Sequence, residues 1–359
     1  MKKIICSLIV ICTFLSALPA YANATTMTVE QAVEYALEHS DAFAKKDAEI
    51  LTATYTLYQA SLAEKRLKKM PEVPSMTIDV YLSYVGYYTD AARFGETVAK
   101  RGKEDLEKSI QRDVKNDFYT YLNSVEIKNT AEENMQITQE RMAAAKQKLD
   151  LGLISRLDYE NFVLASKGAE NSYNQAVRDC DYNLIKLKNT MNFPVESQLV
   201  PVGEFMYEPK EVLAAEEAIK KSREGNAYLN IYDTFELSKE KWKFYSNYYT
   251  SSQYEYKIEE GNFNAAQTDF RTNVNTLDMN IRSMYNSLLT IKEQIEYTQG
   301  YVDYLEDNAE AMYLRFEMGL VTASDWRQAQ QEYFKTKNDL RALELTYFVN
   351  CMTYEGLFE

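Results

Sequence analysis

The sequence has few of the residues from which most catalytic and metal sites are built. It contains one histidine, His39, and four cysteines among 359 residues, so little is available for acid-base chemistry or for a histidine-rich metal site. It also lacks the G-x-S-x-G, H-E-x-x-H, C-x-x-C and phosphate-loop motifs of common enzyme classes. We therefore expect no enzyme, no cofactor and no bound metal.

Long hydrophobic runs are scarce as well. One runs from Ile4 to about Leu18, after two lysines and before small residues at Ala20, Ala22 and Ala24. It is shorter than the roughly 20 residues of a spanning helix and ends in a cleavage-like pattern, which predicts a secretory signal peptide over residues 1–22. We expect an exported protein without a helical membrane anchor.

Positive charge is in deficit. The chain has 40 Lys and Arg against 54 Asp and Glu, a net charge of −14, and loss of Lys2 and Lys3 with the signal peptide would remove two more positive charges. An acidic protein of this kind is a poor partner for nucleic acid. Signal cleavage would also leave only Cys180 and Cys351, which both fall on apolar helix stripes. A disulfide between them stays open, because sequence spacing does not give their distance.

Proline is absent from residues 75–193 and 210–359, and such intervals predict very long helices. A helix from about Ala91 to Leu151 would be on the order of 90 Å long. One heptad-spaced apolar seam comprises Tyr173, Val177, Cys180, Leu184, Leu187 and Met191. A similar stripe comprises Leu106, Ile110, Val114, Phe118, Tyr121 and Val125. Helices this long must bury their seams against a repeat partner and against other subunits.

Two of the eleven glycines occupy matching positions. LDLGLISRLDY at 149–159 aligns with FEMGLVTASDW at 316–326, which pairs Gly152 with Gly319 and Asp158 with Asp325. The match indicates a duplication, with a first repeat at 23–202 and a second at 203–359. Each repeat is predicted to hold a short helix, a long helix, a connection, a very long helix, the glycine turn and a returning helix.

Each glycine turn has the residues of a helix end followed by a helix start. Glycine accepts the positive φ that ends a helix, Ser155 or Thr322 can cap the next one, and Asp158 or Asp325 takes the capping-box position. A turn explains these residues but not the apolar ones around each glycine. An apolar tip that occurs twice indicates a docking surface.

The segments KLDLGLISRLDYENF (148–162) and RFEMGLVTASDWRQAQ (315–330) resemble the tip motif of the TolC-like outer-membrane efflux proteins. The signal peptide, the TVEQAVEYAL opening of the mature chain and the duplicated layout extend this resemblance over essentially the whole mature chain. It implies a mainly α fold of long antiparallel coiled-coil hairpins in two tandem repeats. These would form part of a trimeric α-barrel, with short or vestigial β-strands.

The resemblance also implies roles for individual residues. The adaptor-docking tips would comprise Leu151, Gly152, Leu153, Ile154, Ser155, Met318, Gly319, Leu320, Val321 and Thr322. Asp325 matches an acidic position at which family members narrow their tunnel, and Asp158 is its counterpart in the first repeat. Gln328 stands where a second carboxylate can occur, so an acidic constriction would be weaker here.

The connection that should carry membrane strands departs from the family pattern. Residues 74–90 hold one alternating stretch, which predicts a single membrane strand; it comprises Met76, Ile78, Val80, Leu82 and Tyr84. The counterpart at 244–263 is tyrosine-rich and fits continuous helix equally well. The tyrosine clusters at both connections fit either a membrane-interface belt or helix packing. A membrane barrel built on these connections would be reduced or absent.

Two functions follow from the resemblance. The first is the outer component of a tripartite efflux or type I secretion-like system, a passive homotrimeric conduit that docks to a periplasmic adaptor and an inner-membrane pump. The alternative is an exported coiled-coil envelope scaffold of the same fold without a membrane barrel. The expected location is the outer membrane and periplasm, or the extracytoplasmic envelope if the barrel is absent.

Overall fold

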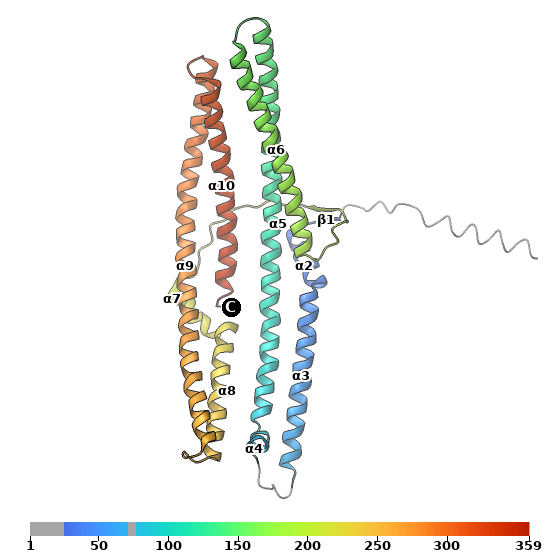
Figure 1. Cartoon of the computed structure of the whole chain (residues 1–359), viewed down its shortest axis with the longest axis vertical. Coiled ribbons are helices and arrows are strands. Elements are labelled where there is room, and N and C mark those ends of the chain that lie inside the picture. Colours follow the sequence, from blue (N-terminus) through green and yellow to red (C-terminus); the bar gives the residue numbers. More distant parts are fainter. Residues whose placement is uncertain (1–24, 71–76, 359) are drawn as a thin grey trace, which may run out of the picture.

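The computed structural model describes residues 25–70 and 77–358. It is dominated by two long antiparallel helical hairpins that stand side by side (Figure 1). The predicted signal peptide and Met76 lie outside the described residues. The described part confirms the predicted fold class, a mainly α protein of long paired helices.

The two hairpins have nearly the same dimensions. The first pairs α5 (Tyr87–Asp150) with α6 (Arg156–Thr190), and the second pairs α9 (Tyr254–Glu317) with α10 (Ala323–Glu355). Both α5 and α9 contain 64 residues, which corresponds to about 96 Å of helix. The very long helices expected from the missing prolines are therefore present in both halves.

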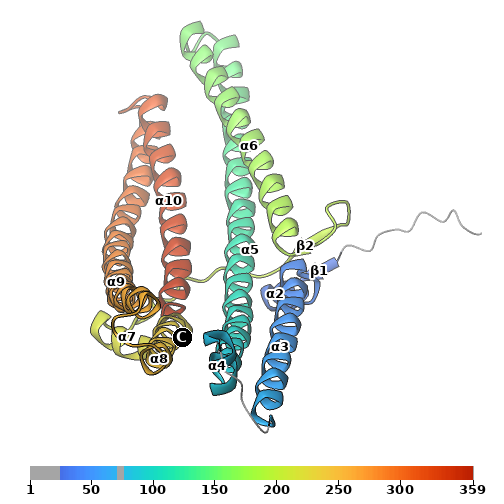
Figure 2. The same cartoon turned by 60° about the horizontal axis from the view of Figure 1, so that its bottom comes forward.

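Shorter helices cover the other half of each long helix. In the first half these are α2 (Val29–His39) and α3 (Asp41–Lys68), followed by α4 (Ile78–Val85). In the second half they are α7 (Ala215–Lys221), the 3-10 turn η1 (Ser222–Glu224) and α8 (Asn226–Tyr248). Figures 1 and 2 show α3 beside the lower part of α5, and α8 beside the lower part of α9. Each long helix thus has one partner above its middle and another below it.

A small parallel sheet closes the first half. Strand β1 (Thr25–Met27) pairs with β2 (Leu199–Pro201), with Thr25 opposite Leu199. Within residues 25–70 and 77–358 these are the only strands. The pairing holds the beginning of the described chain against the segment that follows α6.

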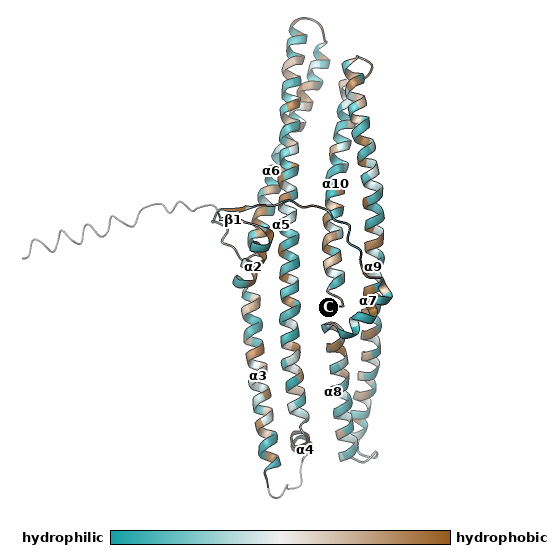
Figure 3. Ribbon diagram, turned by 180° about the vertical axis from the view of Figure 1, so that it is seen from behind, coloured by the Kyte–Doolittle hydropathy of each residue, from teal (hydrophilic) through white to brown (hydrophobic). Residues whose placement is uncertain are grey.

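The core consists of two apolar clusters, one in each half. The α9 seam repeats at heptad-like spacing and comprises Leu277, Ile281, Leu288, Ile295, Val302 and Leu305. In the first half the seam joins α5 to α6 and α2, and it comprises Ala32, Val114, Phe118, Leu187 and Met191. Figure 3 shows apolar and polar residues alternating along the long helices, as expected where only one stripe of each helix is buried.

The linker between the two halves, residues 202–214, is held against the second hairpin by two hydrogen bonds. The Tyr347 hydroxyl donates to the Lys210 carbonyl at 2.8 Å, and the Tyr354 hydroxyl donates to the Leu213 carbonyl at 2.9 Å. Burial raises the pKa of Tyr354 to about 12, so this hydroxyl remains a donor at neutral pH. Earlier in the linker, the rings of Phe205, Tyr119 on α5 and Phe348 on α10 all contact one another, with centroids 5.1 to 5.8 Å apart, which joins the two hairpins.

Both remaining cysteines are buried free thiols, Cys180 on α6 and Cys351 on α10. They lie on the seams of different hairpins, and no disulfide joins them in this structure. Burial raises the pKa of the Cys351 thiol, which keeps it protonated and unreactive at neutral pH.

The predicted strand at 76–84 is wrong for the described residues. Ile78, Val80, Leu82 and Tyr84 lie in α4, which ends at Gly86 with a φ of +91°. The same stretch also has helical spacing, because Ile78, Leu82 and Val85 recur every three to four residues. Only 1 % of the Leu82 surface is exposed, and the Tyr81 ring packs on Tyr248 of α8. Tertiary packing therefore selects the helix.

The tyrosine-rich segment at 244–263 is also helical except for a short turn. Helix α8 ends at Tyr248 and α9 begins at Tyr254. The Gln253 side-chain oxygen accepts a hydrogen bond from the Thr250 backbone N–H at 2.6 Å, which closes the turn between them.

The α9 seam yields a stability prediction. Leu288 is fully buried, whereas its neighbour Leu289 is 40 % exposed. We expect Leu288→Ala to lower the free energy of unfolding by about 2–5 kcal/mol, because it opens a cavity in the seam. Leu289→Ala is the matched control and should cost less than about 1 kcal/mol. Equal losses in denaturant unfolding would contradict the assigned orientation of α9.

Candidate docking site at the hairpin tips

The two glycine turns have the same backbone geometry. Gly152 and Gly319 have φ values of +71° and +72°, the left-handed conformation that residues with a Cβ rarely adopt. After each glycine the chain folds back on its helix: the Leu153 N–H donates to the Lys148 carbonyl at 2.8 Å, and the Leu320 N–H donates to the Arg315 carbonyl at 2.9 Å. Both long helices thus end in a Schellman-type closure.

Each returning helix begins with a reciprocal capping box. The Asp325 N–H donates to the Thr322 hydroxyl at 3.2 Å, and the Thr322 N–H donates to the Asp325 carboxylate at 3.0 Å. Ser155 and Asp158 form the same pair of bonds at 3.1 and 3.2 Å. The predicted caps at Ser155 and Thr322 are therefore present, with aspartate in the place of the usual glutamate.

The apolar residues around both glycines project into solvent. Leu151 and Leu153 are 74 % and 70 % exposed, and Met318 and Leu320 are 65 % and 69 % exposed. Both turns lie at the same end of the molecule (Figures 1 and 2). Ile154 and Val321 are half-buried behind them. Solvated turns have no need of four exposed apolar side chains, so these residues have the character of a contact surface.

The three residues predicted for a constriction lie on the returning helices. Asp158 and Asp325 are exposed, and both carboxylates are engaged by their own capping boxes. Gln328 lies one turn further along α10, in a groove between the hairpins that Asn134 and Thr138 of α5 also line. Whether these side chains narrow a tunnel depends on an assembly, so the constriction stays a prediction.

Just below the tips, Arg141 of α5 joins the two hairpins. Its guanidinium carbon lies 3.6 Å from the centroid of the Trp326 ring on α10. Its Nη1 atom is buried and has no hydrogen-bond partner among the described residues. Burial lowers the pKa of Arg141, and the aromatic face takes the place of a carboxylate for this cation.

In a second link between the hairpins, the cation comes from the second hairpin and its partners come from the first. Arg327 of α10 donates to the Asn161 carbonyl of α6 at 3.2 Å, and its guanidinium carbon lies 6.0 Å from the Phe162 ring centroid. The sequence alone does not point to Arg141 or Arg327, because their role depends on contacts between two hairpins that lie far apart along the chain.

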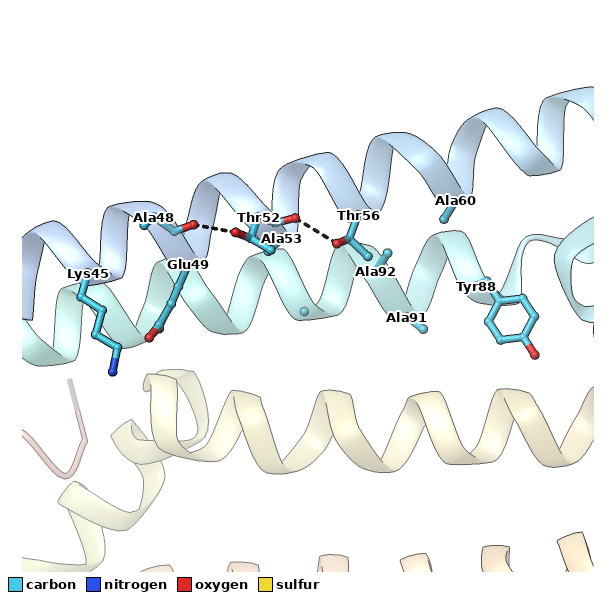
Figure 4. A pocket seen from close by; sticks show the side chains of 11 residues that line it. Lys45, Ala48, Glu49, Thr52, Ala53, Thr56, Ala60, Tyr88, Ala91 and Ala92 are labelled. Atoms are coloured by element: carbon cyan, nitrogen blue, oxygen red, sulfur yellow. Dashed lines mark hydrogen bonds between the residues drawn. The ribbon is translucent and has the colours of Figure 1, made fainter.

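A groove away from the tips lies between α3 and α5. It has a volume of about 760 Å³ and is lined mainly by alanine and threonine. Figure 4 shows Lys45 and Glu49 towards one end and Tyr88 at the other, with Thr52 bonded to the Ala48 carbonyl of its own helix. These side chains do not bring a nucleophile, a base and an anion-binding group close together.

Other candidate chemistry is equally sparse. Over residues 25–70 and 77–358 there is no cluster of three or more His, Cys, Asp or Glu side chains arranged for a metal ion. The His39 Nδ1–H donates to the Tyr35 carbonyl at 2.9 Å, and the His39 ring stacks on the Tyr35 ring, so His39 has a local packing role. None of the helices described has both the length and the apolar character needed to cross a bilayer.

Comparison with known proteins identifies this architecture. The family described as "Outer membrane efflux protein" matches residues 250–348, which include the second glycine turn. The resemblance to the TolC-like outer-membrane efflux proteins is confirmed. No curated protein matches the sequence.

Three solved outer-membrane channels share the TolC-like fold at low sequence identity. CmeC of Campylobacter jejuni has a TM-score of 0.72 at 12 % identity, covering 92 % of this chain and 86 % of its own. VceC of Vibrio cholerae has 0.72 at 11 %, covering 92 % and 97 %. MtrE of Neisseria gonorrhoeae, solved in its open state, has 0.64 at 12 %, covering 92 % and 88 %. The TolC-like fold thus extends over nearly all of the described chain.

The second capping box yields a pH prediction. The hydrogen bond from the Thr322 hydroxyl, followed by that from its backbone N–H, lowers the pKa of Asp325. A lowered folded pKa means that the carboxylate stabilises the turn above its unfolded pKa of about 3.9, and that this contribution is lost as the pH falls through the folded pKa. We expect Thr322→Ala to raise the pKa of Asp325 towards its ordinary value in an NMR titration.

The first turn supplies the control for this experiment. Ser155→Ala removes the equivalent hydroxyl from the other hairpin and should leave the pKa of Asp325 unchanged. Each substitution should also cost about 1 kcal/mol of local helix stability. If Thr322→Ala left the pKa of Asp325 where it is in the unmodified protein, the assigned capping box would be wrong.

Proposed function

We propose that this protein is the outer component of a tripartite efflux or type I secretion-like export system. In this role it is a passive conduit in the outer membrane and periplasm. An inner-membrane pump supplies the energy, and a periplasmic adaptor docks to the hairpin tips. The family match over residues 250–348 and the fold shared with CmeC, VceC and MtrE support this assignment.

The single observation that carries the docking role is the pair of apolar tips. Four side chains at least 65 % exposed flank two glycine turns at one end of the molecule. Their backbones are fixed by matching closures and capping boxes, so the apolar groups are presented without a large loss of conformational entropy on binding. A rigid apolar knob that occurs twice suits insertion into grooves of a helical partner.

A conduit also requires several copies of the chain. Helix α3 has no buried residue, and Leu51, Tyr55 and Tyr58 form an exposed stripe along it with spacings of four and three residues. A heptad-like stripe with no partner in its own chain favours contact with another copy. We assign that contact to a homotrimer in which each protomer consists of two tandem repeats, 23–202 and 203–359. Asp158, Asp325 and Gln328 would then lie near the narrow end of the trimer.

One observation favours a second candidate. The connection between α3 and α5, where a membrane strand was predicted, contains helix α4. This favours an exported coiled-coil scaffold in the extracytoplasmic envelope, which would keep the tips for docking and have no open channel.

The tips can be tested by charge insertion. We expect Leu153→Asp combined with Leu320→Asp to weaken adaptor binding by about tenfold or more, because buried apolar anchors dominate such contacts. Helicity should be unchanged, since both side chains are exposed. Met279→Asp, at another exposed apolar site on α9, is the matched control. If the double variant bound the cognate adaptor and supported export as well as the control, the tip assignment would be wrong.

Channel activity separates the two candidates. We expect purified residues 23–359 to give discrete, cation-preferring conductance steps in a planar bilayer, because the chain is strongly acidic. The oligomer mass is measured on the same sample and should correspond to a trimer. A folded oligomer that gives no conductance would exclude the conduit and leave the scaffold.

A further inference from the structure

The groove between the hairpins that Gln328 lines has an unusual lining for so acidic a chain. Its volume is about 390 Å³, and α5, α6 and α10 all contribute to it. Arg327 is the only charged residue among the described ones that line it, and we call it the arginine groove. Its neutral polar members are Asn134, Thr138, Ser324, Gln328, Gln330 and Gln331.

The arginine groove offers hydrogen-bond donors and no negative charge. The chain has 54 acidic residues against 40 basic ones, yet no Asp or Glu is among the described residues that line this groove. Each amide and hydroxyl side chain there carries at least one N–H or O–H donor. No hydrogen bond within the described chain engages the side chains of Asn134, Gln330 or Gln331. These donors are therefore available to a ligand that accepts hydrogen bonds.

Arg327 is one of two arginines that are withdrawn from water without a carboxylate partner. Within residues 25–70 and 77–358 the arginines that form ion pairs are Arg93, Arg101, Arg112, Arg156, Arg223, Arg282 and Arg341. Water solvates four of the others, which are exposed: Arg66, Arg178, Arg271 and Arg315. Only Arg141 and Arg327 are both half-buried and unpaired, and an unpaired charge is costly to withdraw from water.

The contacts of Arg327 hold it in place without balancing its charge. Its Nε–H donates to the Ala323 carbonyl at 2.9 Å, and its Nη1–H donates to the Asn161 carbonyl at 3.2 Å. Both acceptors are uncharged, and burial lowers the pKa of Arg327. A guanidinium has five N–H donors in one plane, so the Nη2 group of Arg327 is left without an acceptor among the described residues.

Arg141 places a second positive charge nearby. Trp326 covers one face of its guanidinium, but the N–H donors point along the guanidinium plane, and Nη1 is buried with no acceptor in the described part of the chain. Burial is the main cause that lowers the pKa of Arg141, and the charge of Arg327 lowers it further, while Tyr313 and Glu317 act in the opposite sense. An anion beside Arg327 would reduce the repulsion between these two cations.

We propose that the arginine groove binds a small oxyanion, a molecule with a free carboxylate or phosphate group. Arg327 donates to the oxyanion through Nη2, and the amides of Asn134 and Gln331 donate to its other oxygens. A planar guanidinium matches the geometry of both groups. The oxyanion contacts both hairpins, since Asn134 lies on α5 and Arg327 on α10. The proposal does not depend on transport, on adaptor docking or on the trimer.

Tryptophan fluorescence provides the test, with the purified mature chain, residues 23–359. The sequence has two tryptophans, so Trp242→Phe leaves Trp326, the neighbour of Arg327, as the single reporter. Inorganic phosphate and succinate are titrated separately at constant ionic strength, with chloride as the balancing anion. We expect a saturable change in Trp326 fluorescence, and the probe that saturates identifies the group that is bound. No saturable change with either probe would overturn the proposal.

Removing the cation should weaken binding. We expect Arg327→Gln, in the Trp242→Phe background, to raise the dissociation constant about tenfold or more, because hydrogen bonds from a charged donor are strong. Arg315→Gln is the matched control: Arg315 is an exposed arginine near the same tip, and its loss should leave binding unchanged. Equal losses in both variants would indicate a general effect of charge and reject the groove as the site.

A second variant tests the groove while keeping Arg327. Gln331→Glu places a carboxylate one turn from Arg327 on α10, a spacing that allows an ion pair, and should weaken oxyanion binding about tenfold or more. Gln294→Glu adds the same charge at an exposed position on α9 and should have no effect. This pair decides the question if Arg327→Gln loses helicity. Undiminished binding by Gln331→Glu would contradict the proposal, and that result would leave the adaptor and conductance tests unaffected.

Discussion

The structure depends on the burial of two heptad seams over helices that are too long for a compact core. A helix of about 96 Å cannot turn its apolar stripe towards a central cluster, so it must be covered along its length by other helices. In α9 the seam from Leu277 to Leu305 is covered by α10 above and by α7 and α8 below. The hairpin, the returning helix and the shorter lower helix are all consequences of that one requirement.

The same requirement creates two ends with different properties. Where α5 and α9 reverse at their upper ends, the turn is fixed by local chemistry, a glycine with positive φ and a capping box. At the lower ends the two halves are connected differently. In the first half α4 lies between α3 and α5, and in the second half a five-residue turn at 249–253 joins α8 to α9. The upper turns are alike in the two repeats because their geometry admits few sequences, whereas the lower connections differ.

The difference also explains what the sequence could predict. Missing prolines, heptad spacing and the repeated glycine turn are local signals, and each led to the correct element: the long helices, the seams around Cys180 and Cys351, and the caps at Ser155 and Thr322. The stretch from Ile78 to Tyr84 fits alternation and helical spacing alike, so its own residues could not decide between strand and helix. Packing of Tyr81 on α8 decides it, and that contact joins segments far apart in sequence.

Contacts between the hairpins are the features least visible in the sequence. Arg141 has no carboxylate to mark it as one half of an ion pair; its partner is the face of Trp326. A buried cation on an aromatic ring is less directional than a charged hydrogen bond, and Arg327 adds only a single bond to the Asn161 carbonyl. The hairpins are thus joined near mid-height by the mutually contacting rings of Phe205, Tyr119 and Phe348, and close to the tips by Arg141 and Arg327. Each of these upper links pairs one residue from each half of the chain, so no pattern within a single repeat could have predicted it.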